Sequence, residues 1–126
     1  MAYDYDPENI FAKILRGEIP NDTILETDHS LALRDIVPQA PDHVLIIPKG
    51  AYVSFDHFAN EASADEIVDY TRTIGKVCKI LGVDMDVGED GYRMIANTGK
   101  NGVADVPHLH VHILAGKFLG RMLPNI

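Results

Sequence analysis

The sequence predicts one α+β domain over residues 1–126, with a single mainly antiparallel sheet and two helices on one of its faces. Its composition, 46% hydrophobic and 24% charged residues, is ordinary for a soluble domain that buries its own core. Short β-prone segments follow one another with connections too short for crossover helices, which favours antiparallel pairing. Two other segments carry apolar residues at helical spacing.

The first expected element is a short helix over residues 6–17. Asp6 is suited to cap it, Pro7 fits the first helical position and Gly17 fits the exit. The apolar face of this helix would hold Ile10, Phe11, Ile14 and Leu15. Turn residues and prolines then separate three β-prone runs, which predict strands at residues 23–26, 31–37 and 43–47.

The main helix is expected to begin at Ser63, which can form a capping box with Glu66, and to end at Gly82. Its apolar stripe comprises Ile67, Tyr70, Ile74, Val77 and Leu81. Cys78 lies beside that stripe, so we expect a buried thiol without a catalytic role. Two strands should follow, at residues 92–97 and 108–116, joined by a turn that contains Gly99 and Gly102.

Charge and terminal sequence limit the partners and the compartment. A net charge of −8 without a basic patch argues against binding along nucleic acid. The lone cysteine cannot form an intramolecular disulfide, and the acidic amino terminus lacks the regions of a signal peptide. Because no apolar run approaches the ~20 residues of a membrane span, we expect a cytoplasmic protein that does not contact a membrane.

Histidines at positions 108, 110 and 112 alternate with apolar residues. On a strand these histidines would share one face, while Leu109, Val111 and Ile113 would enter the core. A merely wet face would be served equally well by other polar residues. A metal site is disfavoured, because the outer two histidines would lie roughly 13 Å apart at about 3.3 Å of rise per residue. Nucleophilic catalysis at phosphorus needs all three rings on one face, with neutral imidazole as the attacking group.

Four segments together resemble the nucleotide-binding branch of the histidine triad (HIT) family. They are "IFAKILRGEIP", "RDIVPQAPDHVLIIPKG", "YRMIANTG" and "HLHVHIL", the last matching the family pattern of three histidines separated by apolar residues. The resemblance implies a HIT-like fold and hydrolysis of nucleoside phosphoramidates or related purine adducts through a covalent nucleotidyl-histidine. We expect no cofactor and no metal, since imidazoles and backbone donors supply the stabilisation that a cation would otherwise give.

The resemblance also implies roles for individual residues. His110 would be the nucleophile, His112 would contact the α-phosphate and help to protonate the leaving group, and the carbonyl of His108 would orient His110. His43 would lie beside the nucleophile, Asp35 would accept the ribose hydroxyls and Asn97 would lie near the phosphate. The base pocket would be lined by Phe11, Ile14, Leu33 and Ile36. His29 and His57 match no functional position, so we expect them on the surface.

One segment departs from the family. Val103, Ala104 and Asp105 stand where the family usually carries Gly-Gln-Ser, and only Val106 fits the pattern. An ionised Asp105 cannot donate a hydrogen bond to a phosphate and would repel it. With Asp105 in place, a nucleotide-binding sensor or scaffold without catalysis stays open. A dinucleoside polyphosphate hydrolase is the other alternative, and the amino-terminal segment "IFAKILRGEIP" disfavours it.

A homodimer is expected from the same resemblance. The carboxyl-terminal segment carries many apolar residues beyond the last strand, and these favour burial against a second subunit. They are Phe118, Leu119, Met122, Leu123 and Ile126.

Overall fold

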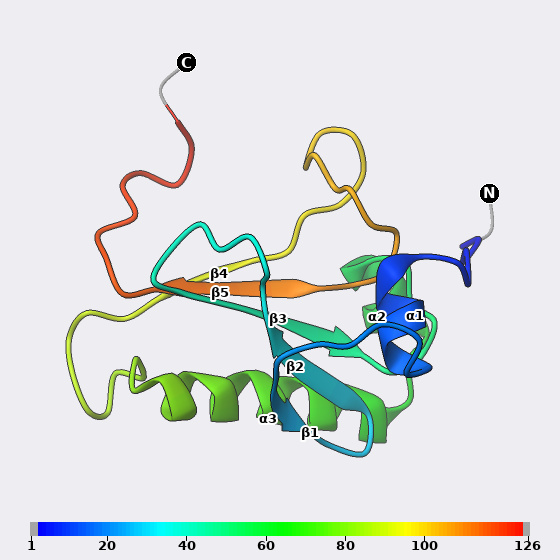
Figure 1. Ribbon diagram of the computed structural model, residues 1–126, viewed down its shortest axis with the longest axis horizontal. Coiled ribbons are helices and arrows are strands. Elements are labelled where there is room, and N and C mark those ends of the chain that lie inside the picture. The colour runs from blue at the N-terminus through cyan, green and yellow to red at the C-terminus, as the bar shows by residue number, and fades with distance from the viewer. Residues whose placement is uncertain (1–2, 125–126) are drawn as a thin grey trace.

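The computed structural model describes residues 3–124, and over these residues the chain forms three helices and five strands (Figure 1). The helices are α1 (Ile10–Leu15), α2 (Phe55–Glu61) and α3 (Ala64–Leu81). The strands are β1 (Thr23–Glu26), β2 (Ser30–Arg34), β3 (Asp42–Pro48), β4 (Arg93–Ile95) and β5 (Val111–Ala115). They form one antiparallel sheet in the order β1-β2-β3-β5-β4, so the expected α+β class is confirmed.

The helices cover both faces of the sheet, and the expectation that they share one face is wrong. Val44 and Ile46 of β3 join the core beneath α2 and α3, whereas Leu45 and Ile47 pack against α1. Side chains alternate between the two faces along a strand, so a strand covered on both faces needs apolar residues throughout. The run "HVLIIP" in β3 meets that need, since it is buried from His43 to Pro48.

The main helix is confirmed at both ends. The Ser63 side chain accepts from the backbone N–H of Glu66, the Glu66 side chain accepts from that of Ser63, and Gly82 ends the helix with a φ of 71°. The expected stripe faces the core, where the Tyr70 hydroxyl donates to the carbonyl of Ile46 at 2.7 Å. Cys78 is buried, as expected.

Two features near the helices differ from the sequence expectations. The cap of α1 is Asn9, whose side chain accepts from the N–H of Ala12 at 2.9 Å, so Asp6 and Pro7 lie in the turn ahead of the helix. Helix α2, capped by Ser54, was not expected, because seven residues are too few to show a helical period.

No helix within residues 3–124 is both long enough and apolar enough to cross a membrane.

The strand that was expected to carry all three histidines of the triad is shorter than the sequence predicts. Strand β5 begins at Val111, so His108 and His110 lie in the segment that leads into it, and only His112 is within the strand. The alternation continues through that segment, since Leu109, Val111 and Ile113 are all buried in the core beneath α3. The histidine rings are thereby directed to the opposite face, where α1 lies.

Candidate active site

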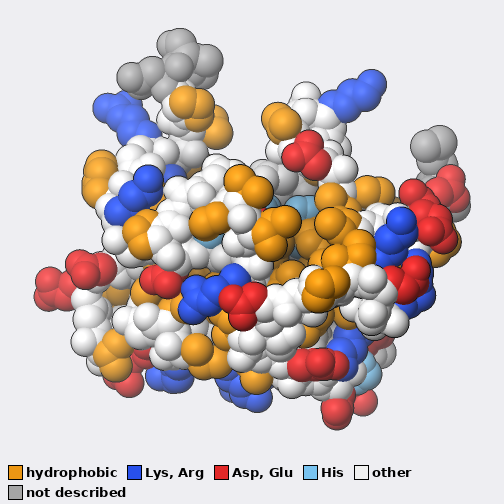
Figure 2. Space-filling model, in the orientation of Figure 1, with side chains coloured by type: hydrophobic (Ala, Val, Ile, Leu, Met, Phe, Trp, Pro, Cys, Tyr) orange, Lys and Arg blue, Asp and Glu red, His pale blue; other side chains and the backbone are white. Residues whose placement is uncertain are grey.

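A cavity of about 560 Å³ lies between α1, the ends of β2 and β5, and the loop that follows β4. Histidine atoms show there between hydrophobic side chains in the space-filling view (Figure 2). Ten of the predicted site residues line this cavity: Phe11, Ile14, Leu33, Asp35, Ile36, Asn97, Asp105, Val106, His110 and His112. The other two, His43 and His108, are buried and contact the lining histidines from behind.

The ring of His110 is held by the backbone of His108. Its Nδ1 lies 2.7 Å from the carbonyl oxygen of His108. The ring of Phe11 packs against the His110 ring, with ring centres 4.9 Å apart. A carbonyl only accepts hydrogen bonds, so Nδ1 of His110 carries the proton. In the neutral ring, Nε2 then keeps a free lone pair.

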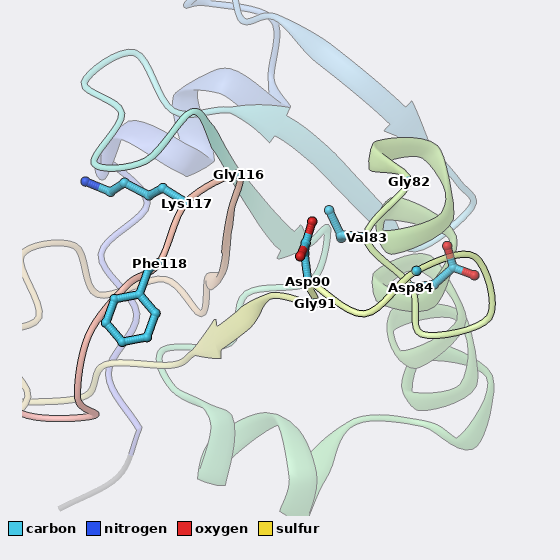
Figure 3. A pocket seen from close by; sticks show the side chains of 9 residues that line it. Gly82, Val83, Asp84, Asp90, Gly91, Gly116, Lys117 and Phe118 are labelled. Carbon is cyan, nitrogen blue, oxygen red and sulfur yellow. The ribbon is translucent and has the colours of Figure 1, made fainter.

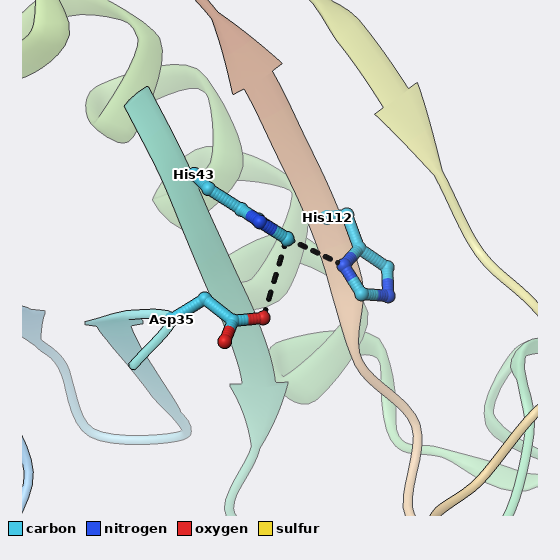
Figure 4. A group of neighbouring side chains, drawn as sticks. All are labelled: Asp35, His43 and His112. Atoms are coloured by element: carbon cyan, nitrogen blue, oxygen red, sulfur yellow. Dashed lines mark hydrogen bonds and ion pairs between the residues drawn. The ribbon is translucent and has the colours of Figure 1, made fainter. Parts of the chain in front are cut away.

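The ring of His112 is held through His43 (Figure 4). The backbone N–H of Gln39 donates to Nδ1 of His43 at 3.1 Å, so the proton of neutral His43 is on Nε2. That Nε2 lies 2.9 Å from Nδ1 of His112 and 3.4 Å from Oδ2 of Asp35. Because Nδ1 of His112 accepts, neutral His112 carries its own proton on Nε2.

Backbone groups therefore give the two lining histidines opposite capacities. The rings of His110 and His112 lie 5.1 Å apart. Nε2 of His110 offers a lone pair and Nε2 of His112 offers an N–H, so one ring is suited to attack an electrophile and the other to donate a proton beside it.

Burial keeps the surrounding histidines neutral. It lowers the pKa of His108 to about 4, against a weaker opposing effect of the hydrogen bond to the Pro48 carbonyl. It also lowers the pKa of His112 to about 4, helped by the charges of His110 and His43. Burial lowers the pKa of His43 as well, although the Asp35 carboxylate acts in the opposite direction. The neutral forms are the ones that the proton positions above require.

The remaining predicted residues divide between the floor and the rim of the cavity. Phe11, Ile14 and Leu33 are buried and pack together with Leu45 in the core beneath α1. Ile36, which is 86% exposed, lies at the rim with the exposed side chains of Asn97 and Asp105. Sequence reasoning missed Ile10, Ile19 and Leu45, which also line the cavity, because an apolar side chain gives no sign of whether it lines a pocket or a core.

The backbone is strained at Val103, the residue that stands where the family usually carries glycine. Val103 adopts a φ of 54°, a region that β-branched residues rarely enter. Hydrogen bonds on either side hold the turn, from the N–H of Val103 to the carbonyl of Lys100 and from that of Ala104 to Gly99. The side chain of Val103 is 75% exposed, so it contributes little packing in return.

One group of side chains within residues 3–124 has the spacing of a metal site. Asp35, His43 and His112 each place a ligand atom within 4.8 Å of the others. Metal binding at Nε2 of His43 would move its proton to Nδ1, which faces the N–H of Gln39 at 3.1 Å. Two N–H groups would then point at each other, so the hydrogen bonds of this site favour a proton over a metal ion.

A second cavity, of about 420 Å³, lies between the segment after α3 and the segment after β5 (Figure 3). Val83, Asp84 and Asp90 come from the first segment, and Lys117 and Phe118 come from the second. The described residues that line it include no histidine, and the Asp84 carboxylate accepts from Nζ of Lys79 at 3.0 Å. This cavity lacks the converging reactive groups of the first.

The expectation that His57 lies on the surface is wrong. It is 8% exposed, stacks on Tyr3 with ring centres 4.2 Å apart, and accepts from the N–H of Val53 at 3.0 Å through Nδ1. Helix α2 carries it inward, and that helix was not foreseen. His29 is half-buried.

Fold and site together define an α+β protein with four histidines gathered in and behind one cavity on one side of the sheet. A family model described as the HIT domain matches residues 16–119, so the chain belongs to the HIT domain family.

Similarity to individual members extends over nearly the whole chain. An uncharacterized HIT-like protein of Azospirillum brasilense is 50% identical over 123 residues, which are 98% of each chain. The purine nucleoside phosphoramidase of Escherichia coli is 43% identical over 118 residues, 94% of this chain and 95% of that protein. A HIT family hydrolase from Clostridium thermocellum superposes with a TM-score of 0.80 at 36% identity, covering 92% of this chain and 97% of that one.

Proposed function

We propose that this protein is a nucleotide-binding hydrolase that cleaves purine nucleoside phosphoramidates or related nucleotidyl adducts. The observation that carries the proposal is the pairing at the cavity of a free Nε2 lone pair on His110 with an Nε2–H on His112. The similarity to a purine nucleoside phosphoramidase supports the choice of substrate.

The reaction would take two steps. Nε2 of His110 attacks the α-phosphorus and the bond from phosphorus to the leaving nitrogen breaks. His112 gives its Nε2 proton to that nitrogen while a proton from solvent replaces it, so His112 stays neutral. Water then attacks the phosphorus, the bond to His110 breaks, and the proton that the water loses returns to solvent through His112. His43 supports both steps, since its Nε2–H holds Nδ1 of His112 as an acceptor.

The cavity supports nucleotide binding beside these groups. The floor formed by Phe11, Ile14 and Leu33 offers apolar contact to a purine, a mode that distinguishes adenine from guanine only weakly. One oxygen of the Asp35 carboxylate already accepts from the N–H of Val37 at 2.9 Å, and its second lone pair is available to a ribose hydroxyl. Asn97 also lines the cavity and would lie near the phosphate.

The decisive experiment compares the wild type with His110→Ala, using an adenosine phosphoramidate as substrate and adenosine monophosphate as the binding probe. We expect hydrolysis to be lost and affinity for the monophosphate to be largely kept, because His110 forms the covalent bond while the floor and Asp35 hold the nucleoside. Mass spectrometry of the quenched wild-type reaction should detect a nucleotidyl adduct on His110. His29→Ala is the control, since this histidine is outside the cavity lining.

Two other results would each point to a different function. Tight binding of the monophosphate by the wild type without turnover would favour a sensor or scaffold. The observation behind this alternative is the exposed Asp105 at the rim, where an ionised carboxylate would repel the phosphate. Faster cleavage of a dinucleoside polyphosphate than of the phosphoramidate would favour the other hydrolase branch. Wild-type turnover by His110→Ala would contradict the mechanism.

The same proposal includes a homodimer. Strand β4 lies at one edge of the sheet with Met94 57% exposed, and an uncovered strand edge can pair with another chain. In the carboxyl-terminal segment Phe118, Met122 and Leu123 are at least 67% exposed in the single chain, while Ile126 lies outside the described residues. Sedimentation at micromolar concentration should give a dimer, and a monomer would refute this part.

A further inference from the structure

The amino-terminal segment reaches the first histidine of the triad across 103 positions of sequence. The hydroxyl of Tyr5 lies 2.7 Å from Nδ1 of His108, and the two rings meet edge to face with centres 5.5 Å apart. His108 is fully buried, and Tyr5 is half-buried ahead of α1. Tyr5 precedes residues 16–119 of the matched HIT domain, and the steps proposed above make no use of it.

The direction of this hydrogen bond follows from the other side of the His108 ring. Nε2 of His108 lies 2.8 Å from the carbonyl oxygen of Pro48, which only accepts, so Nε2 carries the proton. Because burial keeps His108 neutral near pH 7, its Nδ1 has no proton. Nδ1 is therefore the acceptor, and the Tyr5 hydroxyl donates to it.

The residue whose ring Tyr5 holds also orients His110 through its backbone carbonyl. The ring of His108 is fixed at both nitrogens, by Tyr5 and by Pro48, and the carbonyl of the same residue accepts from Nδ1 of His110 at 2.7 Å. Because ring and carbonyl belong to one residue, anchoring the ring at both nitrogens restrains the Cβ and Cα of His108. It thereby restrains the position of the carbonyl that sets where the Nε2 lone pair of His110 points. A hydrogen bond at a buried ring nitrogen opposes displacement of the residue, because the nitrogen would otherwise lose its partner.

We propose that Tyr5 is a positioning residue for the nucleophile, which holds the His108 ring and, through the His108 carbonyl, the orientation of His110. This inference rests on the proposed function for the role of His110. It assigns a part of the active site to the segment that precedes α1.

The chain offers a matched control two residues earlier. The hydroxyl of Tyr3 donates to Oδ2 of Asp56 at 3.0 Å, and its ring stacks on His57 at an interplanar angle of 8°. Tyr3 thus attaches the same segment to the protein through α2, without a hydrogen bond to the triad. Changing either tyrosine to phenylalanine removes one hydroxyl and keeps the ring.

The experiment compares Tyr5→Phe, Tyr3→Phe and the wild type as full chains. With an adenosine phosphoramidate we expect Tyr5→Phe to lower kcat by roughly 5- to 10-fold with KM nearly unchanged, the size expected when one hydrogen bond near the nucleophile is lost. Tyr3→Phe should keep the wild-type kcat. Nitrogen-15 spectra of the histidine rings should show altered signals of both His108 and His110 in Tyr5→Phe alone, and thermal melting checks that each variant is folded.

The possible results separate the two proposals. Unchanged kcat and unchanged His110 signals in Tyr5→Phe would overturn the inference and leave the proposed function standing. Equal losses in both variants would also overturn it, since they would reflect attachment of the segment rather than the His108 ring. If the wild type hydrolyses no phosphoramidate, the proposed function fails, and the His110 signals alone decide whether Tyr5 positions that ring.

Discussion

Acid should destabilise this protein through His108 before its carboxylates are protonated. The residue is fully buried, and its burial lowers the pKa from 6.5 to about 4. Unfolding exposes the ring, which then binds a proton at any pH below 6.5. As pH falls from 6.5 to about 4 the unfolded state therefore gains protons that the folded state does not bind, and the free energy of unfolding declines.

The size of this decline follows from the pKa difference. Each unit corresponds to about 1.4 kcal/mol, so the full interval is worth about 3 kcal/mol as an upper estimate. Below pH 4 both states bind the proton, and His108 contributes no further change. That is a large part of the ~5–15 kcal/mol by which a domain is usually stable.

His108→Gln removes the titration and keeps a side-chain amide that can donate to the Pro48 carbonyl. Urea unfolding followed by circular dichroism, at several values between about pH 4 and about pH 7, gives the free energy of unfolding of each protein. We expect the stability advantage of the wild type over the variant to shrink by about 3 kcal/mol across this range. Contributions of the carboxylates and of the other histidines cancel in the difference.

Leu109→Ala is the control. It truncates a buried apolar neighbour and should cost about 2–5 kcal/mol, but it adds and removes no titrating group, so its curve should run parallel to that of the wild type. Parallel curves for His108→Gln as well would refute the reasoning. They would mean that the folded protein accepts a proton on His108. Nδ1 of His108 would then carry that proton and could no longer accept a hydrogen bond from the Tyr5 hydroxyl.

Three further predictions concern the loop and the histidine cluster. Asp105→Ser should raise kcat/KM for an adenosine phosphoramidate roughly 5-fold or more, since even a quarter of a repulsion of about 4 kcal/mol between charges ~4 Å apart has that effect; unchanged kinetics would place the carboxylate away from the phosphate. Val103→Gly should raise the free energy of unfolding by about 1 kcal/mol, because the strain energy relieved at the positive φ exceeds the entropic stabilisation that glycine gives the unfolded chain. A lower urea midpoint for the variant would contradict this. Exhaustive chelation should leave hydrolysis intact, and loss of activity that zinc restores would instead assign a metal to Asp35, His43 and His112.

Local sequence signals correctly predicted the elements whose own residues mark where they begin and end. The Ser63 capping box and Gly82 delimit α3, and the alternation around Val111 predicted which side chains enter the core. These signals act between neighbours in the chain, so they survive without tertiary information. The side of the sheet on which α1 packs has no such signal, and only the unbroken apolar run of β3 indicates that both faces are covered.

The candidate site shows the same division. Residue type and resemblance identified the histidines and Asp35, which the fold gathers in and behind one cavity. The groups that decide where their protons lie are the Gln39 N–H and the carbonyls of Pro48 and His108. The Tyr5 hydroxyl then donates to the nitrogen of His108 that is left without a proton. Backbone groups occur at every position and carry no sequence signature, and a tyrosine 103 residues away gains meaning only once the chain is folded.

These partners explain why the cluster needs more than two histidines. An isolated pair of imidazoles could exchange tautomers, and either ring could then attack or donate. Here the His108 carbonyl fixes the proton of His110 on Nδ1, and the Gln39 N–H, acting through His43, fixes that of His112 on Nε2. Each ring is left with a single capacity toward the cavity. In the proposed reaction the attacking ring and the proton-donating ring are therefore set before a substrate binds, and little reorganisation would remain for the reaction itself.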